Sequence, residues 1–328
     1  MIYKTLIPLI NEYDSFLIDV YGVLYDGRDF YKGVPELLEK IIKAGKRVVI
    51  LSNTTLVSSV CQTKYEAKGV IKGIHYNEFL SSGEVFKRTM QDSLVGFQTY
   101  IQIFNKNYEI FESSGLTEID TIQNADFVYV GDLNNETVYY VDNLKTKSGN
   151  PISIENILKT SINDVDEFNN LIEVFEKCLK YKKPFVIVNP DIFATESING
   201  SRKTILCQGA IGEFYENLGG KVIYFGKPHK AIYDYAKQHL DGCHKTAMIG
   251  DTTWTDILGG NAAGFDTILT LSGVAGRFIN NMNSNSSTSN LSIEDKLNKL
   301  LIEIAPKMTQ KKLLSSSQLP TYVIEKFA

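Results

Sequence analysis

The sequence predicts an α/β fold built on an open parallel sheet, with a second α/β module inserted into it. In the first hundred residues, short apolar runs typical of buried strands alternate with segments of helical spacing, which implies right-handed crossovers and parallel pairing. From about residue 105 the chain becomes rich in Asn, Asp and Glu, and the alternation resumes at residue 222. The length of 328 residues suits two domains at about 150 residues each. We therefore expect a discontinuous core domain of residues 1–104 and 222–328 and an inserted domain of residues 105–221.

The first part of the core alternates between strands and helices. Residues 15–18 (Ser-Phe-Leu-Ile) form a short apolar run of the kind found in buried strands. Residues 35–44 place Leu and Ile at helical spacing, and Gly45 follows as a C-cap. The other expected elements here are strands at 47–51 and 98–104 and helices at 58–68 and 82–90.

The later elements are less regular. In the inserted module we expect strands at 127–130 and 185–188 and a helix at 165–179. The core pattern returns with a strand at 222–225, a helix at 231–239 and a strand at 247–249. The polar run 280–287 (NNMNSNSS) is expected to be a mobile loop, and residues 293–304 an amphipathic helix.

Composition and charge exclude several classes of protein. The net charge is −4 with both signs mixed along the chain, so we expect no nucleic-acid footprint. The four cysteines are widely spaced and form no metal-binding pattern, which is typical of reduced thiols in a cytosolic protein. The N-terminal residues lack a signal-peptide pattern, and no apolar segment approaches the roughly 20 residues that cross a bilayer. We expect a cytoplasmic protein without nucleic-acid or membrane partners.

Four chemically suited side chains stand at the ends of apolar runs. Asp19 and Asp251 each follow such a run, and Ser52 and Lys227 lie at the ends of two others. In an open parallel sheet, ligands bind beyond the carboxyl ends of the strands. Two carboxylates, a hydroxyl and an ammonium at that edge would make a site for a divalent metal ion and a phosphoryl group.

Each of these residues also has a structural interpretation. A strand-end aspartate such as Asp19 is a common turn or N-cap residue, and Ser52 with Asn53 could cap a helix. In the functional interpretation, Asp19 attacks phosphorus or binds a metal, and Ser52 with nearby backbone N–H groups donates to phosphoryl oxygens. The Gly-Lys-Pro turn around Lys227 restrains that side chain, whose charge would neutralise an aspartate and a phosphate.

The segment 250–257 (GDTTWTDI) is the most specific local signal. Asp251 lies at a strand end, and Asp256 lies in the first turn of the next helix. One can bind a divalent cation directly and the other through water, which suits Mg²⁺. Scattered histidines and the absence of glycine-rich nucleotide motifs argue against histidine-metal, dinucleotide and P-loop sites. Asp132 and Asp191 also follow apolar runs; Asp132 is not expected to act chemically, and Asp191 is expected to frame the pocket entrance.

Together these motifs resemble the haloacid dehalogenase-like superfamily, specifically subclass IIA, the p-nitrophenylphosphatase-like and nucleotide-monophosphatase-like hydrolases. The resemblance covers nearly the whole chain, and its closing segment LPTYVIEKF (319–327) resembles the tail of one branch of the subclass. The matching segments are DVYGVLYDG (19–27), LSNT (51–54), SSGE (81–84), NPD (189–191), GKPHKAIY (226–233) and GDTTWTDILGGNAAGFDTILTLSGV (250–274).

The resemblance implies a Rossmann-like core with a large inserted α/β cap of the C2 type. It assigns Asp19 as the nucleophile that forms an aspartyl-phosphate, assisted by Ser52 and Lys227. Mg²⁺ would be coordinated by the Asp19 carboxylate, the Tyr21 backbone carbonyl and Asp251, with Asp256 supporting from the outer shell. The residues expected to bind the phosphate or the substrate are Ser52, Asn53, Lys227 and Asp191.

Tyr21 departs from the family pattern. Active phosphatases of the family carry a second aspartate at this position, which protonates the leaving alcohol and then activates water. A phenol with a pKa of about 10 can donate a proton but is a poor base near neutral pH. We expect the sequences of this branch to share an aromatic residue here. Asp26, seven residues beyond Asp19, is the candidate substitute, although a weak one.

The sequence therefore predicts a Mg²⁺-dependent phosphatase of small phosphorylated metabolites. Tyr21 is expected to reduce its rate or to narrow its substrate range. The alternative is a non-catalytic protein that binds a phosphorylated ligand, and a third hypothesis is phosphoryl transfer to an acceptor other than water. The resemblance also makes a cap-mediated homodimer plausible. The substrate itself is not encoded in any pattern that we can identify.

Overall fold

The computed structural model describes residues 2–92, 96–133, 140–152, 156–198, 201–304 and 319–328. The chain divides into two compact units. The first, called the core unit below, consists of Met1–Ser52, Ser58–Ser81 and Lys227–Ala328. The second, called the inserted unit, consists of Asn53–Val57 and Ser82–Gly226.

Within the described residues, the core unit builds a seven-stranded sheet in the order β1-β14-β13-β12-β2-β3-β4, and every neighbouring pair is parallel. The inner strand β2 lies between β12 and β3, with Ile18 level with Ile249 and Ile50. The strands are β1 (Ile2–Tyr3), β2 (Ser15–Ile18), β3 (Arg47–Ser52), β4 (Glu78–Ser81), β12 (Thr246–Gly250), β13 (Asp266–Thr270) and β14 (Tyr322–Ile324).

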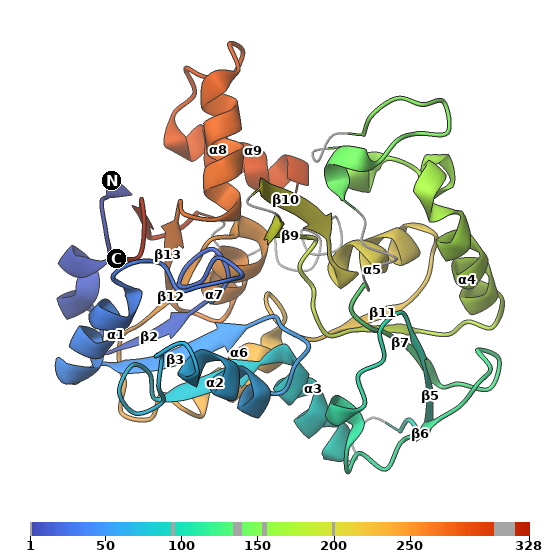
Figure 1. Ribbon diagram of the computed structural model, residues 1–328, viewed down its shortest axis with the longest axis horizontal. Coiled ribbons are helices and arrows are strands. Elements are labelled where there is room, and N and C mark those ends of the chain that lie inside the picture. Colours follow the sequence, from blue (N-terminus) through green and yellow to red (C-terminus); the bar gives the residue numbers. More distant parts are fainter. Residues whose placement is uncertain (1, 93–95, 134–139, 153–155, 199–200, 305–318) are drawn as a thin grey trace. The chain divides into compact units, whose positions relative to one another are not determined.

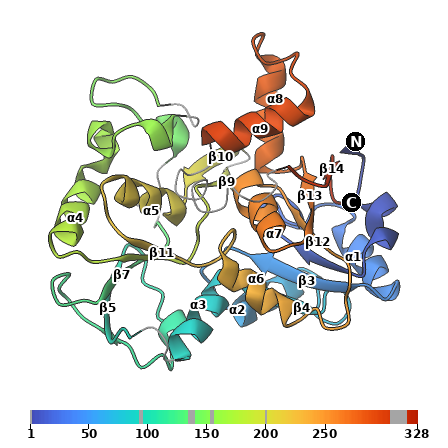
Figure 2. The same cartoon turned by 180° about the vertical axis from the view of Figure 1, so that it is seen from behind.

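The inner strands are apolar along their length because helices cover both faces of the sheet. Every residue of β2 and of β12 is buried. Helices α2 and α6 lie on opposite sides of the strands, as Figures 1 and 2 show from the two faces. The core helices are α1 (Val34–Lys43), α2 (Ser58–Glu66), α6 (Lys230–Lys237), α7 (Leu258–Ala262), α8 (Val274–Ser284) and α9 (Ile293–Ile304), with the 3-10 helix η1 (Ile7–Glu12) and the π-helical turn η7 (Thr253–Ile257).

The inserted unit has a parallel sheet of its own. In the part of the chain that the structure describes, it has five strands in the order β11-β8-β7-β5-β6, and an antiparallel hairpin of β9 and β10. The strands are β5 (Thr99–Ile103), β6 (Thr117–Glu118), β7 (Phe127–Val130), β8 (Phe185–Ile187), β9 (Phe193–Ile198), β10 (Ser201–Leu206) and β11 (Val222–Tyr224). The helices are α3 (Ser82–Gln91), α4 (Asn169–Lys180) and α5 (Gln208–Asn217), with short 3-10 turns at Glu109–Phe111, Val141–Asn143, Ile157–Lys159, Ile162–Asp164 and Asp166–Phe168.

The inserted unit is larger than the change in composition indicates. We expected its boundaries near residues 105 and 221, whereas the structure divides the chain after Ser81 and after Gly226. Strand β5 pairs with β7, and β11 pairs with β8, so both belong to the inserted sheet. Their apolar runs resemble those of the core strands, which is why local patterns assigned both to the core.

Most individual elements match the sequence prediction, with one clear exception. The run 280–287 was expected to be a loop, but α8 extends through Ser284. Ala275, Phe278 and Ile279 are buried at helical spacing and anchor this helix, so its polar end continues from a packed start. Among the described residues, no helix is long and apolar enough to cross a membrane.

The position of β2 inside the sheet gives a test of the fold. Leu17 is fully buried and lies between Met248 and Val49 in register. We expect Leu17→Ala to lower the free energy of unfolding by roughly 2–5 kcal/mol, because it leaves a cavity inside the sheet. Urea denaturation followed by circular dichroism measures this loss. The matched control is Ile7→Ala, whose side chain is 60% exposed and which should change the free energy by less than about 0.5 kcal/mol; equal losses would contradict the fold.

Candidate active site

The carboxyl ends of β2, β3 and β12 carry the predicted site residues of the core unit. Asp19 follows β2, Ser52 is the last residue of β3, and Asp251 follows β12. The backbone N–H of Asp19 donates to the carbonyl of Ile249 at 2.9 Å, so the parallel pairing continues to the first residue of the loop. Adjacent parallel strands therefore deliver these residues to one edge of the sheet, as the sequence predicted.

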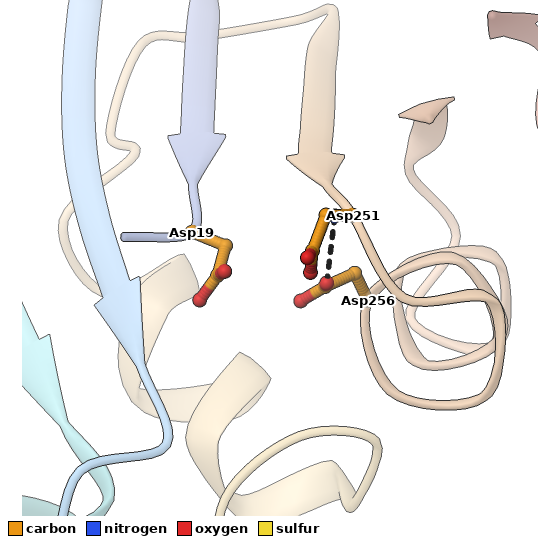
Figure 3. Close-up of side chains that lie close together, drawn as sticks. All are labelled: Asp19, Asp251 and Asp256. Carbon is orange, nitrogen blue, oxygen red and sulfur yellow. Dashed lines mark hydrogen bonds between the residues drawn. The ribbon is translucent and has the colours of Figure 1, made fainter. Parts of the chain in front are cut away.

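Three carboxylates meet at this edge (Figure 3). Asp19, Asp251 and Asp256 each offer an oxygen, and these oxygens lie within 4.8 Å of one another. All three residues are buried, with exposed fractions of 8%, 5% and 1%. Such a spacing allows one small cation to contact oxygens of more than one carboxylate.

Asp251 is held in place by its neighbours in the chain and by α8. Its Oδ1 accepts the hydroxyl of Thr252 at 2.9 Å, and its Oδ2 accepts the backbone N–H of Val274 at 2.7 Å. A Cβ atom on either Gly22 or Gly273 would overlap this carboxylate, so both positions require glycine. The start of α8 also favours a negative charge here, because its first N–H groups point toward Asp251.

Asp256 closes the turn that begins at Asp251. Its Oδ2 accepts the backbone N–H groups of Asp251 and Thr252, both at 3.1 Å. Gly250 allows this closure, because a Cβ atom there would overlap the Asp256 carboxylate. The π-helical turn Thr253–Ile257 brings Asp256 back to the strand end. The five-residue spacing in the sequence thus places both carboxylates in one cluster.

Lys227 supplies the positive charge of the site. Its Nζ lies 2.5 Å from Asp19 Oδ1 and 2.8 Å from Asp256 Oδ1, and it donates to the Leu51 carbonyl at 3.0 Å. The side chain is only 2% exposed. This ammonium therefore connects the nucleophile candidate to the end of β3, one residue before Ser52.

The cluster carries an excess of negative charge. Three carboxylates at −1 each and one ammonium at +1 sum to −2 when all are ionised. Burial raises the pKa of Asp19 well above its ordinary value of 3.8, Lys227 opposes this rise, and the Asp256 and Asp251 carboxylates add to it. A divalent cation matches the excess in charge, and the all-oxygen donor set suits Mg²⁺. The residues present therefore fit the predicted metal ion.

The remaining predicted residues lie as follows. Ser52 is buried at the end of β3, level with Ser81. Tyr21 is 40% exposed, and its ring packs edge-on against Tyr25 with centroids 5.6 Å apart. Asn53 and Asp191 both belong to the inserted unit and meet there, with the Asn53 amide donating to Asp191 Oδ1 at 3.0 Å.

Sequence reasoning gave no role to the residues that hold Asp251. Thr252, Gly22 and Gly273 each act on that carboxylate, by a hydrogen bond or by leaving room for it. Thr252 and Gly22 could have been identified from the sequence, because each stands next to a predicted site residue. Gly273 lies 22 residues after Asp251, so only the three-dimensional structure reveals its proximity.

Comparison with known proteins agrees with this geometry. Residues 16–117 match the family of haloacid dehalogenase-like hydrolases, and residues 224–286 match a second, HAD-hydrolase-like family. The first match contains Asp19 and Ser52, and the second contains Lys227, Asp251 and Asp256.

The chain belongs to the haloacid dehalogenase-like superfamily of hydrolases. This confirms the predicted resemblance and the enzyme class, a phosphomonoesterase-like hydrolase. Over 275 residues this haloacid dehalogenase-like hydrolase is 25% identical to the chloroplastic phosphoglycolate phosphatase 1A of Arabidopsis thaliana, covering 81% of the chain and 70% of that protein. It is 24% identical to chronophin of Bos taurus over 271 residues, covering 81% of the chain and 84% of that protein.

Solved structures share the fold of this hydrolase. A possible sugar phosphatase from Cytophaga hutchinsonii superposes with a TM-score of 0.66 at 20% identity, covering 99% of this chain and 98% of that one. The glycerol phosphate phosphatase of Mycobacterium tuberculosis, in complex with magnesium, gives a TM-score of 0.57 at 18% identity, covering 84% and 73%. The predicted α/β fold with a parallel core sheet and an inserted α/β unit is confirmed.

The raised pKa of Asp19 gives a pH-dependent test. Above its ordinary value of 3.8, folded metal-free protein binds more protons at Asp19 than the unfolded chain, so its stability falls as pH rises through the raised pKa. We expect the melting temperature of metal-free wild type to fall more steeply than that of Asp19→Asn as the pH rises above 3.8. Differential scanning calorimetry in chelator-treated buffer measures both slopes, and equal slopes would contradict the electrostatic description of the site.

Proposed function

We propose that this hydrolase is a Mg²⁺-dependent phosphatase of small phosphorylated metabolites that works through an aspartyl-phosphate on Asp19. The observation that supports the proposal most strongly is the buried cluster in which Lys227 contacts both Asp19 and Asp256, with the Asp251 carboxylate in the same group. Such a cluster can hold a cation and a nucleophile together beside a phosphoryl group. The phosphatase names of the relatives point in the same direction.

The chain's own residues would divide the reaction as follows. An oxygen of Asp19 attacks phosphorus, and the bond from phosphorus to the ester oxygen breaks as the alcohol leaves. Lys227 holds the Asp19 carboxylate and offsets negative charge on the phosphoryl oxygens. The Ser52 hydroxyl and the backbone N–H of Asn53 orient these phosphoryl oxygens. Bound Mg²⁺, held by Asp19, the Tyr21 carbonyl and Asp251 with Asp256 behind them, would supply further neutralisation of that charge. Water then attacks the phosphorus of the aspartyl-phosphate, the bond from phosphorus to the Asp19 oxygen breaks, and orthophosphate leaves with the Asp19 carboxylate restored.

Tyr21 sets the proposed limit on this chemistry. A carboxylate at this position would provide the proton for the leaving alcohol and then activate water, whereas a phenol does the second task poorly. Asp26 is not arranged to substitute, because its Oδ1 accepts the backbone N–H groups of Arg28 and Asp29, both at 2.8 Å, and closes its own turn. We therefore propose that good leaving groups react well and that the phosphoenzyme hydrolyses slowly.

We also propose that the inserted unit is the cap that selects the substrate, with Asp191 at its entrance. Cytoplasmic location remains a prediction from the cysteine spacing and the N-terminal sequence, and a cap-mediated homodimer remains a prediction from the family resemblance. Light scattering coupled to size-exclusion chromatography tests the dimer.

The second candidate function is binding of a phosphorylated ligand without turnover, and the tyrosine at position 21 is the observation that favours it. Calorimetric binding of a phosphometabolite, with no product after hours at saturating Mg²⁺, would support this alternative. Product formation that depends on Asp19 would exclude it.

The nucleophile assignment predicts the behaviour of one variant. Asp19→Asn should lower p-nitrophenyl phosphate hydrolysis by at least about a thousandfold, because it removes the attacking oxygen. The assay follows p-nitrophenolate release with and without Mg²⁺. The control is Asp26→Asn, a nearby carboxylate outside the cluster, which should stay within about twofold of wild type. Equal activity of wild type and Asp19→Asn would refute the proposal.

The role of Tyr21 predicts a gain of function. Tyr21→Asp should raise turnover of an alkyl phosphate by roughly 10²–10⁴, the usual contribution of general acid–base catalysis. The gain should be smaller for p-nitrophenyl phosphate, whose leaving group needs little protonation. Steady-state kinetics on the two substrates measures the difference. No gain on either would show that Tyr21 is not the limiting residue.

A further inference from the structure

The segment Asn53–Val57 follows Ser52 directly, yet it packs with the inserted unit. Thr55, which is only 2% exposed, donates its hydroxyl to Asp132 Oδ2 at 2.8 Å. Gln208, at the start of α5, donates its amide to the other oxygen of the same carboxylate. The backbone carbonyl of Thr55 accepts the Asn107 amide at 3.1 Å. Thr55 is thus fastened through both its side chain and its backbone.

A second carboxylate holds the beginning of the same segment. The Asn53 amide donates to Asp191 Oδ1 at 3.0 Å, and its Oδ1 accepts the hydroxyl of Ser82 at 3.2 Å. Ser82 begins the second stretch of the inserted unit and Gly226 ends it, so both ends of that stretch lie beside Asn53. A Cβ atom on Gly226 would overlap Ser82 Oγ and crowd Asn53 Oδ1.

Glycines allow these close approaches of backbone. A Cβ atom on Gly83 would overlap the carbonyls of Thr55 and Leu56, and one on Gly209 would overlap the backbone of Pro190 and Asp191. The backbone N–H of Gly83 also donates to the Thr54 carbonyl at 3.1 Å. The segment is therefore packed on one side by the start of α3 and held on another by two aspartates.

Both aspartates follow the carboxyl ends of strands in the inserted sheet. Asp132 follows β7 and Asp191 follows β8, two adjacent parallel strands. The chain order places β6 on one side of β5 and β7 on the other, so the topological switch point lies between β5 and β7. Here the chain's own Thr55 interacts with the carboxylate that such an edge would otherwise present to a ligand.

We propose that Asp132 is a positioning residue for phosphoryl binding, acting through Thr55 on the segment that follows Ser52. The inference rests on the proposed function. Because the Ser52–Asn53 peptide is planar, the direction of the Asn53 N–H and the placement of Ser52 depend on how the following residues are held. Asp132 needs no contact with substrate to do this.

The test measures the dissociation constant of orthophosphate by calorimetry at saturating Mg²⁺. Thr55→Val, an isosteric change that removes the hydroxyl, should weaken phosphate binding by roughly three- to tenfold, the effect of about one hydrogen bond. Asp132→Ala should weaken it by a similar factor. Because both variants remove the same bond, the double variant should be no weaker than Asp132→Ala alone. The affinity for Mg²⁺, whose ligands lie in the core unit, should be unchanged in all three.

Three controls separate positioning from general damage. Thr55→Ser keeps the hydroxyl and Asp132→Asn keeps an acceptor, so both should stay within about twofold of wild type. Glu118→Ala removes the exposed ion pair with Lys106 in the same unit and should leave phosphate binding unchanged. Wild-type affinity in Thr55→Val, or multiplied losses in the double variant, would overturn the inference. If wild type neither binds orthophosphate nor hydrolyses phosphate esters, the proposed function fails and this inference fails with it.

Discussion

The crowding of three buried carboxylates around one ammonium is the constraint on which the rest of the site depends. Like charges at this spacing disfavour one another, and burial adds to that cost. The surrounding structure offsets this cost in two ways. Backbone N–H groups donate hydrogen bonds to the carboxylates of Asp251 and Asp256, and the Lys227 ammonium lies between Asp19 and Asp256. Gly22 and Gly273 leave the space that this arrangement needs. We propose that these features serve to bind a cation and an anion.

The two units contribute different things to the proposed reaction. The core unit carries the charged groups: Asp19, Asp251 and Asp256 follow its parallel strands, and Lys227 lies just before α6. The inserted unit carries no member of that cluster, but it holds the segment Asn53–Val57 through Asp132 and Asp191. In the proposed reaction, separate parts of the chain would therefore orient the backbone beside the phosphoryl group and supply the charge.

The charged residues could be predicted because each stands where a local pattern changes. A short apolar run ending in Asp or in Gly-Lys-Pro is visible without long-range information, and parallel pairing then implies that Asp19 and Asp251 meet. The division between the units could not be predicted, because β5 and β11 carry the same apolar pattern as core strands and only their partners differ. The hydrogen bond between Asp132 and Thr55 could not be predicted either. The two residues lie 77 positions apart, and hydrophobic periodicity carries no information about side-chain hydrogen bonds.

The most direct test of the central claim is a calorimetric titration of the metal-free protein with MgCl₂ at a series of pH values above 3.8, each repeated in two buffers of different ionisation enthalpy. The account predicts one saturable site per chain and release of protons on binding, because a cation among the carboxylates lowers the raised pKa of Asp19. The same titration of Asp251→Asn should show greatly weakened binding. Saturable binding that is unchanged by this substitution, or binding by wild type without proton release, would contradict the account.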